Sequence, residues 1–329
     1  MKSFVLMTGA LFMMFAAPLY AEKSSADLDK AVDTFYSTGC TAESPERLGA
    51  MRTVQAALDA ITPADYKQFY LRGLEIPADE LRGIYEKHPG LHFYDRAFEK
   101  VLNEVKTEKV APGDVVIWLV YNMGYVVKTS KHCFGIDIHH RRAEELVPYL
   151  EFLLVTHNHP DHSTLRLQYA MNAAGKKVYS NFFPSYGGYS KEPFRKVQHG
   201  DLTVYSYESD HNANLRKFMM PFEIVCGPEE SDCVIFSSGD SCNAKQLKPT
   251  SKRVDFYLVH PYVGLDVVEA QTTVHPEVTL VSHLQELHHP FDKWRWSYEN
   301  GIWAANLIRK AGRTAWVPVW GEKIVWHKK

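Results

Sequence analysis

Apolar residues recur at helical spacing in the first third of the chain. Ser44-Pro45 and Thr62-Pro63 each join a capping side chain to a proline suited to the first turn of a helix. The apolar positions of the first of these helices repeat every three or four residues and predict one buried face: Leu48, Met51, Val54 and Leu58. We therefore predict a helical segment over residues 26–110.

The pattern changes after the turn-forming residues 111–114, where short apolar runs replace the helical repeat. These runs predict strands over residues 115–121, 125–128, 134–138, 151–155, 177–179, 202–207, 222–226, 234–236, 255–259, 278–281 and 315–320. Helices are expected between them, over residues 141–149, 163–174 and 296–310. Strands interspersed with helices, too many for one simple parallel sheet, predict a layered α/β sandwich.

The first 21 residues have the features of a secretory signal peptide. Lys2 gives a positive start, residues 4–17 are apolar, and small residues precede the polar stretch that opens at Glu22. The apolar run is shorter than the roughly 20 residues that cross a bilayer, although an uncleaved anchor is the alternative. We predict export to the periplasm or the medium, with no membrane span after signal cleavage. The expected units are 1–21 (signal peptide), 22–110 (helical extension) and 111–329 (sandwich domain).

Composition and charge exclude several classes of protein. The 37 Lys and Arg residues nearly balance 39 Asp and Glu residues, so no basic surface for nucleic acid is expected. A hydrophobic fraction of 45% excludes a disordered chain. Five cysteines leave at least one thiol unpaired; Cys226 and Cys233 flank a turn and are candidates either for a disulfide or for two reduced core residues.

The strongest chemical signal follows the predicted strand 151–155. His157, His159, Asp161 and His162 fall within six residues. Imidazole and carboxylate groups together are ligands for Zn²⁺, Fe or Mn²⁺. A purely structural role is disfavoured, because burying so many polar groups without partners costs free energy. The turn therefore predicts a metal site at a strand end.

This His-x-His-x-Asp-His turn after an apolar strand resembles the signature of the metallo-β-lactamase superfamily. The sequence that follows His283, from residue 284 to Tyr298, is closest in character to the ascorbate-phosphate lactonase group of that superfamily. The resemblance implies an αββα sandwich from about Val115 to the C-terminus, with the N-terminal helical extension outside the common fold. It also implies further ligands downstream.

Three residues match the downstream ligands of the family in order. His211 follows the strand 202–207, Asp240 follows the strand 234–236 in a Gly-Asp pair, and His283 ends the strand 278–281. The competing histidines are His199, His275, His288 and His289, while His260 is expected to be structural or to line the pocket. The resemblance implies two metal ions, most readily zinc, with manganese or iron as alternatives. The first would be held by His157, His159 and His211, the second by Asp161, His162 and His283, with Asp240 between them.

The implied activity is hydrolysis of a small-molecule phosphoester or lactone-like ester by a hydroxide shared between the metals, with Asp161 as the catalytic residue. A β-lactamase-type hydrolase of cyclic amides and a non-catalytic metal-binding scaffold are the alternatives. Substrate-contacting or ligand-supporting roles are expected for Asn122, Glu286, His289 and Arg295. The helical extension is expected to form a homo-oligomer contact or a lid.

Aromatic residues are divided between pocket and core. Candidates for an apolar pocket wall are Tyr121, Tyr125, Phe182, Phe183 and Tyr186. The tryptophans of the C-terminal region, Trp294, Trp296 and Trp303, are expected in the core or at an interface.

Overall fold

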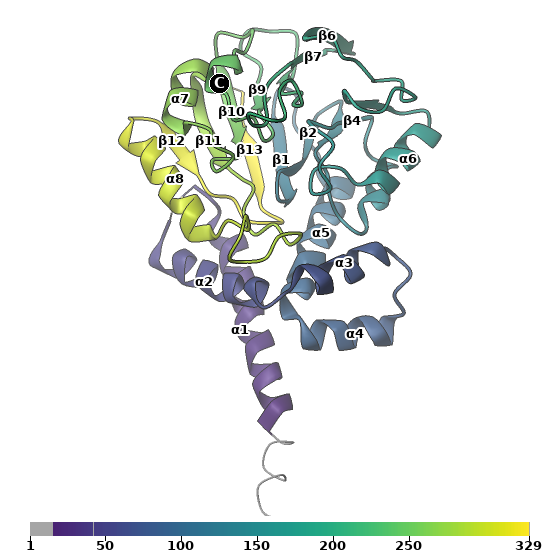
Figure 1. Cartoon of the computed structure of the whole chain (residues 1–329), viewed down its shortest axis with the longest axis vertical. Helices are drawn as coiled ribbons and strands as arrows, with labels where there is room; N and C mark the ends of the chain where they lie inside the picture. Colours follow the sequence, from purple (N-terminus) through teal and green to yellow (C-terminus); the bar gives the residue numbers. More distant parts are fainter. Residues whose placement is uncertain (1–15, 42, 329) are drawn as a thin grey trace, which may run out of the picture.

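The computed structural model describes residues 16–41 and 43–328 and forms two β-sheets flanked by helices (Figure 1). The first sheet contains six strands: β1 (Val115–Tyr121), β2 (Gly124–Thr129), β3 (Cys133–Ile136), β4 (Phe152–Leu154), β5 (Lys177–Tyr179) and β13 (Lys323–Trp326). The second contains seven: β6 (Phe194–His199), β7 (Leu202–Tyr207), β8 (Phe222–Val225), β9 (Val234–Ser237), β10 (Val254–Val259), β11 (Pro276–Val281) and β12 (Thr314–Trp316). Most of these strands were predicted to within two residues.

Parallel pairing dominates the part of each sheet that carries the site. The first sheet runs β13-β1-β2-β3-β4-β5, with β3, β4 and β5 mutually parallel. The second runs β12-β11-β10-β9-β8-β7-β6, with β9 to β12 parallel. Helix α6 (Leu165–Ala173) lies on one flank of the sandwich, and α7 (Val267–Val274) and α8 (Tyr298–Lys310) lie on the other (Figure 1). The predicted αββα sandwich is confirmed.

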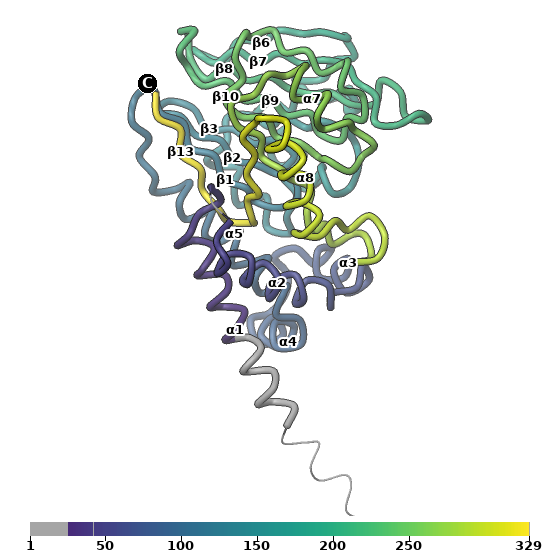
Figure 2. The backbone as a smooth tube through the Cα atoms, turned by 90° about the vertical axis from the view of Figure 1, so that its left-hand side faces the viewer, coloured from purple at the N-terminus to yellow at the C-terminus, as the bar shows by residue number. Residues whose placement is uncertain are grey.

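The helical extension lies at one end of the sandwich (Figures 1 and 2). It comprises α1 (Ala16–Thr38), α2 (Pro45–Asp59), α3 (Pro63–Leu71), α4 (Ala78–Lys87) and α5 (Pro89–Thr107). The predicted caps are present: the Ser44 hydroxyl accepts the Arg47 N–H, and the Thr62 hydroxyl accepts the Asp65 N–H. Phe93 of α5 stacks on Trp320 at 5.5 Å, so the apolar core continues from the extension into the sandwich.

Buried ion pairs join the same two regions. Arg47 of α2 donates two hydrogen bonds to the Glu322 carboxylate, at 2.7 and 2.8 Å, and both side chains are buried. Arg141, which follows β3, binds the carboxylate of Asp95 in α5. Because each pair is shielded from water, the extension is attached by contacts that are costly to break.

Five elements differ from the prediction. Residues 141–149 form only a short 3₁₀ turn, η1 (Ala143–Leu146), because Pro148 cannot continue a helix. Strand β6 was missed because its exposed and half-buried residues do not form an apolar run. Helix α7 is rich in valine and threonine and begins at the Asp266 cap, which the prediction overlooked. The short β13 was also missed, and the run 315–320 is extended only at its start.

The N-terminal prediction lies largely outside the described chain. Residues 1–15 of the predicted signal peptide are not described, and residues from Ala16 onward are in α1. Among the described residues, no helix combines the length and apolar character that crossing a membrane requires. Cys226 and Cys233 face each other through a backbone hydrogen bond across the β8–β9 turn, and both are free thiols.

Candidate metal centre

Carboxyl ends of parallel strands from both sheets converge on one point. In the second sheet, β9, β10 and β11 are followed by Asp240, His260 and His283. In the first sheet, β4 is followed by His157, the first residue of the histidine-rich turn. Neighbouring parallel strands end at the same sheet edge, so residues distant in sequence become neighbours in space.

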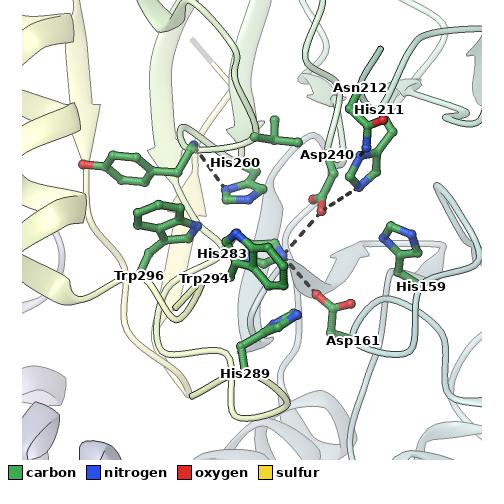
Figure 3. Close-up of a pocket in the computed structure, with 12 residues that line it drawn as sticks. His159, Asp161, His211, Asn212, Asp240, His260, His283, His289, Trp294 and Trp296 are labelled. Atoms are coloured by element: carbon green, nitrogen blue, oxygen red, sulfur yellow. Dashed lines mark hydrogen bonds and ion pairs between the residues drawn. The ribbon is translucent and has the colours of Figure 1, made fainter. Parts of the chain in front are cut away.

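All seven predicted ligands lie in this cluster (Figure 3 draws part of it). Ligand atoms within 4.8 Å of one another form one group of His157, His159, His211 and Asp240, and a second of Asp161, His162 and His283. Asp240 lies between the groups: its Oδ2 is 3.7 Å from His157 Nε2 and 3.6 Å from His283 Nε2, and its Oδ1 is 3.1 Å from His162 Nε2. The grouping matches the division inferred from the family resemblance.

Several buried atoms of the cluster have no hydrogen-bond partner within the protein. They are the Nε2 atoms of His157, His162 and His211 and Oδ1 of Asp240. Unpaired buried polar atoms are costly and rare, so a concentration of them calls for a further partner. The five imidazoles and two carboxylates of the cluster are the ligand chemistry of Zn²⁺ and related ions. The residues therefore fit a pair of divalent cations.

Asp137, at the end of β3, orients two of the histidines and was missed in the sequence. Its carboxylate accepts the Thr156 N–H at 2.7 Å, the Thr156 hydroxyl at 2.6 Å and His162 Nδ1 at 3.0 Å. Thr156 Oγ1 in turn lies 3.1 Å from His157 Nδ1. Both rings thus engage their Nδ1 atoms outside the cluster, which leaves Nε2 directed inward. The sequence feature that could have indicated this role is an aspartate inside an otherwise apolar run.

Asn122, in the turn after β1, supports the second group. Its side-chain Nδ2 donates to Asp161 Oδ2 at 3.0 Å, and its main-chain carbonyl accepts the main-chain N–H of His283 at 3.1 Å. The same Asp161 oxygen lies 3.0 Å from His283 Nε2. Asn122 is buried and does not line the pocket, so its role is to orient these two residues.

The buried charges in the cluster compensate one another. Burial alone would raise the pKa of the Asp161 carboxyl, but His162 and His283 lower it well below its ordinary value. Burial would lower the pKa of His162, but Asp240 and Asp161 raise it well above its ordinary value. Burial lowers the pKa of His157, with His162 adding to the effect. The site is therefore built to keep its carboxylates ionised.

His260 was expected to be structural or pocket-lining, and it lines the pocket. Its ring stacks on His283 with centroids 3.8 Å apart. It also forms a third group of neighbouring ligand atoms with Asp240 and His283. His260 is thus an additional imidazole beside His283 and Asp240 that the family resemblance did not suggest.

The cluster opens into a cavity of about 400 Å³ (Figure 3). Its lining residues are His159, Asp161, His211, Asn212, Asp240, His260, Tyr262, Val263, His283, His289, Trp294 and Trp296. Trp294 and Trp296 were expected in the core or at an interface, and they line this pocket instead. Tyr121 and Tyr125, which were candidates for its wall, are fully buried.

The remaining predicted residues have distinct positions. His289 lines the pocket, and its Nδ1 lies 2.5 Å from the buried Glu286 carboxylate, which supports it. Arg295 does not reach the pocket: it is buried and donates to the carbonyls of Leu58, Glu286, Leu287 and His289. Among the competing histidines, His199 bonds Tyr179, His275 ends α7 and His288 contacts His139, and none of these three is in the cluster.

Comparison with known proteins gives matches only at the level of structure. No protein-family model and no curated protein matches the chain. Igni18, a novel metallo hydrolase from the archaeon Ignicoccus hospitalis KIN4/I, aligns over 66% of this chain and 100% of its own, with 14% identity and a TM-score of 0.51. CmlA, a diiron β-hydroxylase from Streptomyces venezuelae, aligns over 66% and 55%, with 14% identity and a TM-score of 0.50.

These similarities identify the fold. The two-sheet sandwich and the neighbouring metal-dependent proteins show that this chain has the metallo-β-lactamase fold. The chain spans about half of the length of CmlA and all of Igni18. Because one relative is named a hydrolase and the other a hydroxylase, the fold alone does not select a reaction. The more specific resemblance to ascorbate-phosphate lactonases stays a prediction.

Proposed function

We propose that this protein is an exported hydrolase that uses two divalent cations, most readily zinc, to cleave a lactone-like ester or a phosphoester. The observation that carries the proposal is the convergence of seven imidazole and carboxylate side chains from four segments on one open cavity. Export rests on the signal-like residues 1–21 alone.

Two bound cations would supply Lewis acidity and lower the pKa of water towards neutrality. The chain supplies orientation and proton transfer. Asp161 Oδ2, which contacts Asn122 Nδ2 and His283 Nε2, would orient the attacking water and accept its proton. In the reaction the water oxygen bonds to the acyl carbon or phosphorus, the ester bond to the leaving oxygen breaks, and that oxygen takes the proton.

The test is hydrolysis by metal-analysed protein of three substrates in parallel: a lactone, a phosphodiester and a cephalosporin. We expect turnover of the lactone or the phosphodiester, and its loss when a chelator removes the metal. Cleavage of the cephalosporin alone would indicate a β-lactamase-type enzyme. Bound metal without turnover of any ester would favour a non-catalytic scaffold and contradict the proposal.

A matched pair of variants makes the test specific. His159→Ala/Asp161→Ala should lower kcat/KM by more than about a hundredfold, because even the outer partners of metal ligands are worth ten- to a hundredfold. His132→Ala is the control, since His132 pairs with Glu151 and Asp201 away from the cluster. Full activity in the double variant would reject the assignment.

A further inference from the structure

The cavity has two chemically different halves (Figure 3). Besides the metal-binding side chains, the lining has a mostly aromatic wall, formed by Tyr262, Val263, Trp294 and Trp296. The rings of Tyr262 and Trp296 stack with centroids 4.4 Å apart and planes inclined by 21°. Trp294 stands edge-to-face to His289 at 5.6 Å. Such a wall offers flat, apolar surface to a bound molecule.

The lining contains no lysine or arginine among the residues that the structure describes. Arg295, between the two tryptophans in sequence, directs its guanidinium at main-chain carbonyls. Lys293 holds its ammonium 4.4 Å from the centre of the Trp294 ring. On the Tyr262–Trp296 part of the wall, an anionic group of a substrate such as a phosphorylated sugar would therefore lie against aromatic carbon with no lysine or arginine among the described residues of the lining, which is unfavourable.

The wall is held in place before any ligand binds. Arg295 Nη1 donates to Leu58 O at the end of α2, at 2.9 Å, and the Tyr298 N–H donates to Gln55 Oε1 at 3.1 Å. Trp296 O accepts the Gln285 N–H at 2.8 Å. Contacts of this kind reduce the ordering needed on binding and so favour recognition by a preformed surface.

We infer that the substrate of this site carries an uncharged, flat aromatic group that packs on the Tyr262–Trp296 wall while its ester faces the metal ligands. This inference rests on the proposed hydrolase function and narrows it. A benzo-fused lactone has the required chemistry: water adds its oxygen to the carbonyl carbon, the ring C–O bond breaks, and the phenol oxygen takes the proton, giving a hydroxy acid.

The experiment compares two lactones on the zinc-loaded full chain: dihydrocoumarin, which is benzo-fused, and δ-valerolactone, which has the same lactone ring without the aromatic part. Dihydrocoumarin also has the better leaving group, a phenol instead of an alkanol, so the aromatic contact is measured by how far a substitution changes the ratio of the two kcat/KM values. Trp296→Ala should lower the dihydrocoumarin value, and with it this ratio, about tenfold. Phe291→Ala is the control, because Phe291 lies in the same loop, is 64% exposed and does not line the cavity.

A binding measurement separates this inference from the proposed function. Calorimetry of the metal-stripped protein with dihydroquinolinone, the uncharged lactam analogue, should give binding that Trp296→Ala weakens about tenfold and Phe291→Ala does not change. If the lactam binds in this way but no ester is cleaved, the proposed function fails and the pocket inference stands. If Trp296→Ala leaves the ratio of the two lactones unchanged, or a ring-carboxylated dihydrocoumarin is cleaved as well as the parent, the inference is overturned and the hydrolase function stands.

Discussion

Four residues next to the metal ligands, or among them, have left-handed backbone conformations. Their φ angles are +53° for Asn122, +46° for Asp137, +52° for Gly239 and +60° for His283. This conformation costs an L-residue about 1–2 kcal/mol and is concentrated at functional sites. Each lies just after a strand, where the reversal in backbone direction turns the chain into the cluster.

Gly239 gives the sharpest test of this geometry. A Cβ at this position would lie 2.6 Å from Thr156 Oγ1, in addition to the strained φ. Gly239→Ala should therefore lower the free energy of unfolding by about 2–4 kcal/mol and weaken metal binding, because Thr156 orients His157. Denaturant titration and a zinc-binding isotherm measure the two effects.

Gly175→Ala is the matched control. Gly175 has φ +72° but nothing within 4 Å of its Cβ position, so only the backbone strain of about 1 kcal/mol is expected and zinc binding should be unchanged. Equal losses of stability in the two variants would show that the contact with Thr156 does not matter.

His140 should make stability depend on pH. Its ring is buried between Phe98 and Tyr94, at 4.0 and 4.1 Å, and this burial, with Arg141 and Arg142 nearby, lowers its pKa well below the ordinary value. Below about pH 6.5, His140 binds a proton in the unfolded chain but stays neutral in the folded chain. The contribution of this group should therefore lower the free energy of unfolding by about 1.4 kcal/mol for each unit by which the pH is lowered.

His140→Phe keeps the stacking and removes the titration. The unfolding free energy of the unmodified protein minus that of the variant should therefore decrease as the pH falls from about 7 to about 5. Asp95 Oδ1, 3.5 Å from His140 Nε2, is the carboxylate that would oppose this effect. Parallel pH profiles for the two proteins would mean that folding does not lower the pKa of His140.

At the residue scale, the sequence reveals what lies close together along the chain. The four ligands within residues 157–162 could be predicted because they lie together in one turn. His211, Asp240 and His283 required the family order as a guide. The supporting role of Asp137 and the pocket position of Trp296 depend on which strand ends meet in space, and no local pattern encodes that.

At the scale of elements, the loop 284–297 connects the helical extension to the pocket. Arg295 donates to one main-chain carbonyl at the end of α2, that of Leu58, and to three carbonyls of the loop itself. The loop carries His289, Trp294 and Trp296 into the cavity. The extension therefore contributes to the pocket without lining it.

Arg295→Ala should free this loop. Loss of a buried guanidinium and its partners is expected to cost about 2–4 kcal/mol of stability and to speed hydrogen exchange across residues 284–297. Arg253→Ala, which removes carbonyl contacts to Ser231 and Asp232 in another turn, is the control. Unchanged exchange in the loop of the Arg295 variant would show that other contacts fix the wall.

Elements with regular apolar runs were predictable and irregular ones were not. Strands β1, β5 and β7 were predicted with their observed bounds because their runs are apolar or alternate regularly. Helix α7 resembles a strand in composition, and its Asp266 cap accepts two backbone N–H groups that start the helix. Capping and packing outweigh intrinsic propensity there.

At the scale of the whole molecule, the extension and the sandwich share one core. The buried Arg47–Glu322 pair connects α2 to the C-terminal segment, where Glu322 also accepts the Val319 N–H at 2.7 Å. Such long-range pairs are invisible in the sequence, because the partners are 275 positions apart. We expect unfolding to be cooperative across both regions.

Arg47→Ala should lower the unfolding free energy by about 3–5 kcal/mol, because it leaves the Glu322 carboxylate buried without its partner. The control Arg72→Ala removes an ion pair whose two side chains are 40% and 47% exposed, and a much smaller change is expected. Denaturant unfolding followed by both tryptophan fluorescence and far-UV circular dichroism measures stability and cooperativity. Similar losses for the two variants would contradict the role of the buried pair.

The most direct test of the account is the zinc stoichiometry of the metal-stripped protein, measured by equilibrium dialysis and elemental analysis. The account predicts about two equivalents for the unmodified chain and for His132→Ala, and at most one tightly bound equivalent for Asp240→Asn, since Asp240 lies between the two ligand groups. Fewer than one equivalent in the unmodified chain, or two retained after Asp240→Asn, would contradict it.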